Sequence, residues 1–125
     1  HAVLEPLNKD QNWDDAINLG KKIQANKVDF PDGVNVGFMK IIDKNNLELK
    51  VLERGSGLTL ACGSGACAAA AMAILRKLVI SPVKVHMDGG ILIIEWDSLN
   101  TIIMSGPAEI VFEGEFDLSL LEKYE

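Results

Sequence analysis

The sequence predicts an α+β domain in which an antiparallel, strongly curved, barrel-like β-sheet wraps around one central helix. The first observation is a helical segment over residues 65–78, in which residues 67–75 leave no polar face. A helix that is apolar all round is expected to be buried on all sides. The second observation is that about seven segments of strand character, mostly joined by short loops, are available to surround it. At 125 residues the chain has the length of a single domain, residues 1–125.

The first half of the chain predicts one amphipathic helix and a hairpin. Apolar residues recur at helical spacing over residues 13–25, and Asn12 precedes them as a candidate N-cap. A turn is expected at residues 30–33, which include proline, aspartate and glycine in succession. Residues 1–7 are expected to form a short strand followed by a loop. Two further strands are expected at residues 34–42 and 47–53, with residues 43–46 as the hairpin loop.

After the central helix the chain is predicted to be almost entirely β. Asp88-Gly89-Gly90 is a hairpin signal between two β-rich segments, and Gly106-Pro107 predicts a bend. Residues 117–124 are expected to close the chain with a helical turn. The strands of this half are expected at residues 83–87, 91–96, 101–105 and 108–116.

Composition and charge argue against several classes of protein. The net charge is -6 and the basic residues are scattered, which argues against binding to nucleic acid. The longest apolar run, residues 66–75, is too short to span a membrane, and no signal peptide is visible. Two cysteines are too few for a disulfide framework, so we expect a reducing, cytoplasmic environment.

The most informative segment is the glycine-rich stretch over residues 53–70, which places Cys62 where the alanine-rich helix begins. The first turn of a helix leaves backbone N–H groups unpaired, and its dipole favours negative charge. A thiol held there loses its proton more easily than a free one. The same N–H groups can hold a carboxylate, so one loop is suited to a reactive thiolate and an acidic substrate.

Together with four shorter segments in the same order, this stretch resembles the C-terminal half of the diaminopimelate epimerase family. The matching segments are residues 1–3, 31–38, 53–69, 105–108 and 111–115. The resemblance implies one of two similar domains, each a sheet around a central helix, with the active site between them and the N-terminal domain absent from this chain. It implies an isomerase that converts LL-diaminopimelate to meso-diaminopimelate without a cofactor, in lysine and peptidoglycan biosynthesis. It further implies a homodimer of the full-length protein.

By this resemblance Cys62 is one of two cysteines that exchange a proton with the substrate, and the second lies in the N-terminal domain. The isolated domain is therefore expected to be inactive. Cys67 follows five residues later along the same helix, so we interpret it as a small core residue. The resemblance assigns His1 and Glu53 to positions that tune the cysteine pKa values.

The resemblance also implies the substrate contacts. Gly63 and Ser64 match positions whose backbone N–H groups hold the reacting α-carboxylate. Asn35, Glu53 and Arg54 match positions that contact the distal amino and carboxylate groups, and arginine can bind a carboxylate with two parallel hydrogen bonds.

Two departures from the family pattern and several alternatives stay open at this point. Leu58 stands where many members carry glutamate, and the Asn-Pro that usually precedes the histidine is missing before His1. The alternatives are another epimerase or racemase of the superfamily, similar to proline racemase, and a non-catalytic domain that retains the fold. A thiol redox domain is disfavoured because no Cys-x-x-Cys is present, and the cysteine spacing predicts no metal site.

Overall fold

The computed structural model describes residues 1–124 of the chain, with the side chains of residues 122–124 left out of the description. It contains two α-helices, α1 (Trp13–Ala25) and α2 (Gly63–Leu75), and a terminal 3-10 helix, η1 (Leu118–Tyr124). The described residues also form the strands β1 (Ala2–Val3), β2 (Val36–Asp43), β3 (Asn46–Glu53), β4 (Gly57–Thr59), β5 (Val83–Met87), β6 (Gly90–Glu95) and β7 (Ile103–Ser105).

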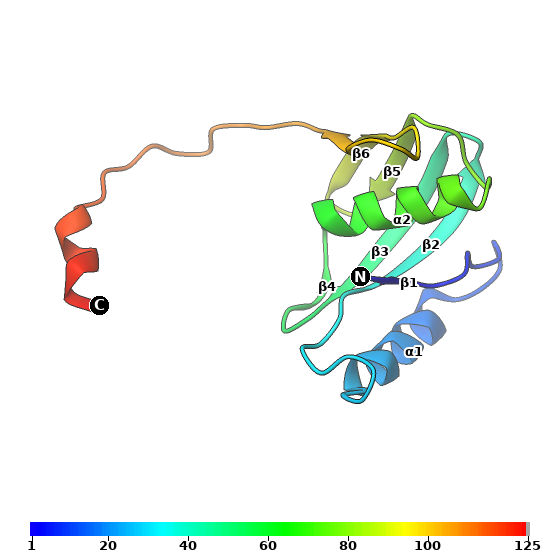
Figure 1. Ribbon diagram of the computed structural model, residues 1–125, viewed down its shortest axis with the longest axis horizontal. Coiled ribbons are helices and arrows are strands. Elements are labelled where there is room, and N and C mark those ends of the chain that lie inside the picture. The colour runs from blue at the N-terminus through cyan, green and yellow to red at the C-terminus, as the bar shows by residue number, and fades with distance from the viewer. Residues whose placement is uncertain (125) are drawn as a thin grey trace.

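All seven strands belong to one curled sheet, which confirms the predicted α+β class (Figure 1). The strand order is β1-β2-β3-β5-β6-β7, and β4 pairs with β3. The sheet is mixed, because β1 is parallel to β2 and β3 is parallel to β5, so the expectation of a purely antiparallel sheet needs this correction. Parallel neighbours need a crossover connection. Here α1 lies in the connection from β1 to β2, and α2 lies in the connection from β3 to β5.

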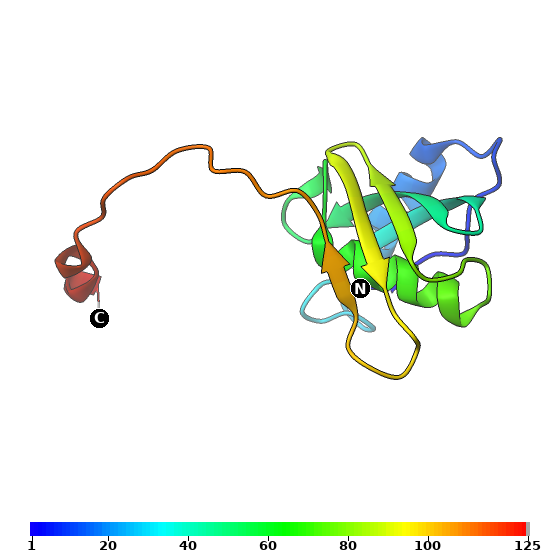
Figure 2. The ribbon, with the colours of Figure 1, turned by 90° about the horizontal axis from the view of Figure 1, so that it is seen from above.

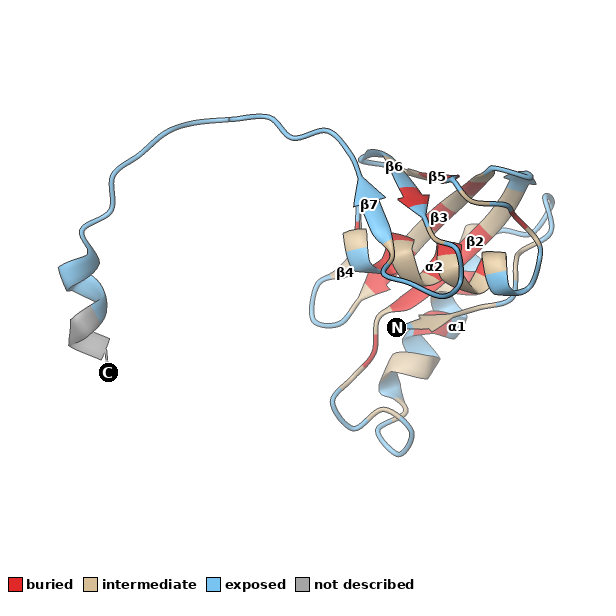
Figure 3. Cartoon of the chain, turned by 45° about the horizontal axis from the view of Figure 1, so that its top comes forward, coloured by how far each residue is buried: buried red, intermediate tan, exposed pale blue. Residues whose placement is uncertain are grey.

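Helix α2 lies on the concave side of the sheet and buries one of its faces there (Figures 1 and 2). The prediction that it is buried on all sides is wrong for the described residues. Its other face is half-buried, and the Leu75 side chain is 62% exposed, because the sheet closes only half of a barrel (Figure 3). The face toward the sheet consists of small residues that let the backbones approach closely: Gly65, Ala66, Ala69, Ala70 and Ala73.

Helix α1 packs against the opposite face of β2 and β3. Strand residues alternate between the two faces, so Phe38 and Leu52 contact the side of α1 while Met39 and Val51 belong to the core around α2. Gly20 permits this packing, since a Cβ atom there would lie 2.4 Å from Cζ of Phe38. The predicted bounds of α1 and its Asn12 cap are confirmed, because the Asn12 side chain accepts a hydrogen bond from the Asp14 N–H.

The predicted strand at residues 108–116 is wrong for this structure. After β7 the chain leaves the sheet as an extended arm that ends in η1 (Figures 1 and 2). Its apolar side chains are exposed, with Ile110 at 83%, Val111 at 89% and Phe112 at 84%. A strand forms only where its backbone groups find a partner strand. No neighbouring strand within residues 1–124 takes that role.

Smaller differences concern the central helix and the segment before it. Helix α2 begins two residues earlier than predicted and ends at Leu75, and the short strand β4 was not predicted. The closing helical turn is confirmed as η1. Within the described part of the chain, no helix combines the length and apolar character needed to cross a membrane.

Candidate functional site

The predicted site residues lie at one end of the sheet, where segments that are far apart in the sequence meet. Because β1 runs parallel to β2 and β3 runs antiparallel to it, the starts of β1 and β2 adjoin the end of β3. Val36 is the register partner of both Ala2 and Leu52. Strand β4 then folds back along β3 and leads into the start of α2. The topology thereby brings His1, Asn35, Glu53 and Cys62 to the same end of the sheet.

Cys62 is the N-cap residue of α2 and is buried, with 8% of its surface exposed. Its backbone is extended, with φ -147° and ψ 106°, and its carbonyl oxygen accepts the first helical hydrogen bond from the Ala66 N–H at 2.9 Å. Among the described residues its side chain makes no capping hydrogen bond, and the first turn of α2 holds no acidic residue. The N–H groups of this turn therefore have no partner within the helix and face outward at its positive end.

Two glycines at the start of α2 leave space for neighbouring side chains, among them the Cys62 thiol. A Cβ atom on Gly65 would lie 2.9 Å from Cγ2 of Val51 and 3.1 Å from the Cys62 Sγ. A Cβ atom on Gly63 would lie 3.0 Å from Sδ of Met104, which reaches over from β7. Any larger side chain at Gly65 would displace the thiol, so the glycine-rich motif sets the position of Cys62.

The structure brings three of the predicted residues into a connected row. His1 Nε2 lies 2.9 Å from the Ser64 Oγ, and the Ser64 Oγ lies 3.8 Å from the Cys62 Sγ. Sequence reasoning assigned only the backbone N–H of Ser64 to the site. The contact of its hydroxyl group with His1 joins residues that are 63 positions apart, so no local pattern predicts it.

Arg54 and Asn35 form a second cluster beside the first. The Arg54 N–H donates to Oδ1 of Asn35 at 2.8 Å, and the Arg54 Nη1 donates to the Asp32 carbonyl oxygen at 2.6 Å. Asn35 therefore holds the backbone of Arg54 through its oxygen and keeps its amide N–H groups as donors. Both residues line a hollow of about 290 Å³ that also includes His1, Phe30, Gly33 and Val34.

Glu53 is held by a residue that the sequence analysis did not single out. The Thr59 hydroxyl donates to Oε1 of Glu53 at 2.6 Å and lies 3.4 Å from the Ala61 carbonyl oxygen. A hydroxyl has one hydrogen to donate, and the shorter of the two contacts indicates that it points toward the Glu53 carboxylate. The signal for this contact is the pairing of β4 with β3, which sets Thr59 opposite Val51 and close to Glu53.

Cys67 differs from Cys62 in its surroundings. Its side chain is half-buried against the main core, and both cysteines are free thiols. Burial raises the pKa of the Cys67 thiol, and the neighbouring Cys62 adds to the rise of this pKa. Cys67 thus behaves as a neutral packing residue one turn beyond the helix terminus.

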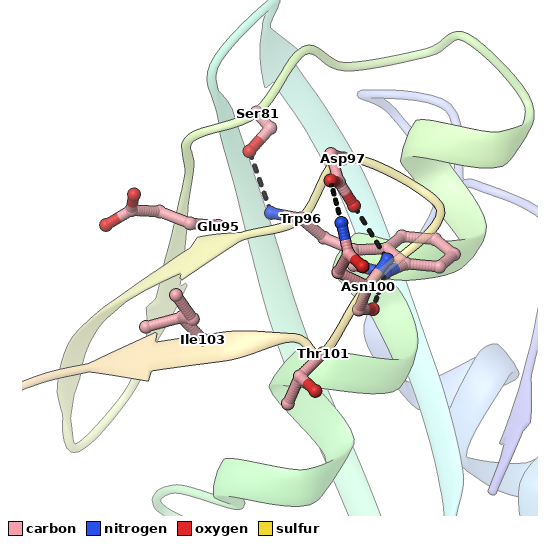
Figure 4. A pocket seen from close by; sticks show the side chains of 7 residues that line it. All are labelled: Ser81, Glu95, Trp96, Asp97, Asn100, Thr101 and Ile103. Atoms are coloured by element: carbon pink, nitrogen blue, oxygen red, sulfur yellow. Dashed lines mark hydrogen bonds between the residues drawn. The ribbon is translucent and has the colours of Figure 1, made fainter.

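A second hollow, of about 380 Å³, lies beside the loop between β6 and β7 (Figure 4). Of its two carboxylates, Glu95 and Asp97, the second accepts hydrogen bonds from the Asn100 and Leu99 N–H groups, and these lower the pKa of Asp97 to about 2. The Trp96 indole N–H donates to the Asn100 carbonyl oxygen at 2.7 Å, and the Trp96 backbone N–H donates to the Ser81 Oγ at 2.9 Å. These polar groups serve the loop itself, so we regard this hollow as structural.

Among the side chains that the structure describes, those of residues 1–121, no group of three or more His, Cys, Asp or Glu is placed to hold a metal ion. The fold and the site together define a curled α+β domain that sets a cysteine thiol and the N-terminus of α2 beside a hollow lined by Arg54. The chain belongs to the diaminopimelate epimerase family, whose profile, described as "Diaminopimelate epimerase", matches residues 5–111.

Curated relatives carry the same name. The diaminopimelate epimerase of Paraburkholderia xenovorans is 55% identical over 92 residues, which cover 71% of this chain and 32% of that protein. That of Cupriavidus metallidurans is 56% identical over 93 residues, or 74% of this chain and 32% of the relative. That of Nitrosomonas eutropha is 53% identical over 100 residues, which cover 79% of this chain and 36% of the relative. The chain thus spans about a third of the length of these relatives.

Proposed function

We propose that this chain is the C-terminal domain, residues 1–125, of a cofactor-independent isomerase that epimerises LL-diaminopimelate to meso-diaminopimelate. The observation that carries the proposal is the placement of Cys62 as the N-cap of α2, beside the hollow lined by His1, Asn35 and Arg54. Family membership and the names of the relatives support it. As in the family, the protein acts in the cytoplasm as a homodimer, in lysine and peptidoglycan biosynthesis.

Inversion at Cα requires a base on one face of the substrate and an acid on the other. Cys62 supplies one of the two groups. Cys67 cannot supply the other, because it stands on the same helix and its thiol is half-buried and kept neutral. The second cysteine comes from the part of the protein outside this chain, and the isolated domain does not turn over substrate.

The remaining residues bind the two ends of the substrate. The first-turn N–H groups of Gly63 and Ser64 hold the α-carboxylate next to the Cys62 thiol. At the distal end the Arg54 guanidinium binds the second carboxylate, since only one of its nitrogens is engaged by Asp32. The Asn35 amide and the Glu53 carboxylate complete the contacts with the distal groups.

The exposed arm fits the same proposal. Residues 108–116 have strand character and expose Ile110, Val111 and Phe112 almost completely. Such a segment is stabilised when it pairs with a sheet edge and buries its apolar side chains. We therefore assign the arm to a contact with the part of the protein that carries the second cysteine.

The test uses the full-length protein with LL-diaminopimelate in deuterated water, and it follows both the appearance of the meso isomer and deuterium at Cα. Cys62→Ser is expected to lower kcat by at least about a hundredfold, the usual contribution of a positioned acid or base. Cys67→Ser is the matched control and retains activity within about threefold, since Cys67 lies outside the site. Unchanged turnover in the Cys62→Ser variant would refute the proposal.

A further inference from the structure

The Ser64 hydroxyl touches both the Cys62 thiol and the His1 imidazole. The Ser64 Oγ is 2.9 Å from the His1 Nε2 and 3.8 Å from the Cys62 Sγ. His1 comes from the start of β1 and Ser64 from the first turn of α2. The imidazole contacts the hydroxyl oxygen of Ser64, and this hydroxyl in turn contacts the buried thiol, so Ser64 links His1 to Cys62.

We propose that Ser64 is a positioning residue whose hydroxyl carries a proton between the Cys62 thiol and the His1 imidazole. The inference rests on the proposed function, in which Cys62 has to be a thiolate in one direction of the reaction and a thiol in the other. The transfer starts from a neutral imidazole whose Nε2 accepts a hydrogen bond from the hydroxyl.

Two proton movements complete the transfer without any further reactant. The Cys62 S–H bond breaks as its proton binds the Ser64 Oγ, and the original hydroxyl proton moves from the Ser64 Oγ to the His1 Nε2. Ser64 ends as the same neutral hydroxyl, Cys62 as a thiolate and His1 as an imidazolium. The Ser64 O–H then donates to the thiolate sulfur, and the reverse movements restore the thiol.

The other charged and titratable groups around Cys62 favour a role for this bridge. Cys67, one turn further along α2, is kept neutral, since burial raises its pKa. The Glu53 carboxylate at the end of β3 is held by Thr59, whose hydroxyl also lies 3.4 Å from the Ala61 carbonyl oxygen, one residue before Cys62. A carboxylate there disfavours a thiolate. The His1 imidazolium, which reaches the thiol through Ser64, and the positive end of α2 favour the thiolate and so offset the effect of the Glu53 carboxylate.

The experiment measures the iodoacetamide alkylation rate of Cys62 in the full-length protein from about pH 5 to about pH 9. Peptide fragmentation separates Cys62 from Cys67. Ser64→Ala is expected to lower the rate at neutral pH about tenfold and to move the pH profile upward by about one unit, because a hydrogen bond to the charged sulfur is lost. Ser64→Thr keeps a hydroxyl and stays within about twofold of the original rate, since the O–H that contacts sulfur is retained.

Two further variants separate the bridge from a general structural role. Ser56→Ala removes an exposed serine hydroxyl from the turn before β4 and should leave the profile unchanged. His1→Gln lowers the rate in the unaltered protein but has no further effect when Ser64 is already alanine, which is the signature of coupled residues. The Cys67 thiol, whose pKa is raised by burial, should react slowly in every folded variant, so a rise in its alkylation rate marks a variant that has unfolded.

An unchanged profile in Ser64→Ala, or additive effects of the two substitutions, would overturn the bridge. Alkylation needs no substrate, so this result is independent of the proposed activity. If the full-length protein epimerises diaminopimelate but Ser64→Ala leaves the pH profile of Cys62 alkylation unchanged, the bridge is rejected and the proposed function stands. The predicted profiles without turnover of diaminopimelate support the bridge and reject the proposed function.

Discussion

Gly33 controls the position of Arg54, and its replacement by alanine separates backbone strain from damage to the site. Gly33 has φ +80°, a left-handed conformation that costs a residue with a Cβ atom about 1–2 kcal/mol. A Cβ atom would also lie 2.6 Å from Cδ of Arg54 and 3.0 Å from its Cγ. Both atoms belong to a flexible, exposed side chain, so we expect Arg54 to move away and the fold to persist.

Gly55→Ala is the matched control, because Gly55 has the same φ of +80° and no described atom within 4 Å of the added Cβ. Both variants should therefore lose about 1 kcal/mol, or about 2–4 °C in melting temperature, for the backbone alone. Only Gly33→Ala should also raise KM for diaminopimelate, by about tenfold, the equivalent of about 1.4 kcal/mol of lost carboxylate binding.

The assay combines thermal unfolding of the full-length protein with steady-state kinetics. The result that would refute the reasoning is an equal change of KM in the two variants, or a normal KM for Gly33→Ala. A much larger loss of melting temperature in Gly33→Ala than in Gly55→Ala would show that Arg54 cannot move aside, which contradicts the exposure of its side chain.

Three further predictions address the site, the core and the acid response. Thr59→Val removes the donor to Glu53 and should lower kcat/KM about tenfold, whereas Thr59→Ser retains activity; equal losses in both variants would contradict this role. Leu49 is 1% exposed, so Leu49→Ala should lower the free energy of unfolding by about 2–5 kcal/mol in denaturant titrations. Leu99 is 88% exposed, and Leu99→Ala, the control, should not cause a loss of this size. The pKa of Asp97 falls from 3.8 to about 2 on folding, so its stabilisation is present above about pH 4 and is lost as the pH falls through 2. In Asp97→Asn the melting temperature should depend less on pH over this range, and an unchanged acid response would show that the loop does not use the charge.

The elements that the sequence predicts well are those with local causes. Helix α1 has the predicted bounds because its amphipathic spacing and the Asn12 cap act within a few residues. The hairpin of β2 and β3 likewise follows from a turn between two alternating segments. The segment 108–116 has the same β-forming composition, yet it is not a strand here, since pairing depends on a partner elsewhere in space.

The candidate site divides in a similar way. The glycine-rich motif by itself locates Cys62 at a helix start, because glycine, cysteine and the alanine run are adjacent in the chain. The contacts that Glu53 and Ser64 make, with Thr59 and His1, come from strand pairing and from the meeting of β1 with α2. No spacing rule predicts these contacts. The contact between His1 and Ser64, for example, joins residues that are 63 positions apart, and only the folded chain shows it.

The sequence by itself therefore determined the α+β class, the central apolar helix, the cysteine at its N-terminus and the family. Tertiary structure alone decided that the sheet is mixed and half closed, that α2 keeps an open face, and that residues 106–117 leave the sheet. The physical reason is that propensity, capping and periodicity act over one or two turns of chain, whereas burial and strand pairing depend on which surfaces meet.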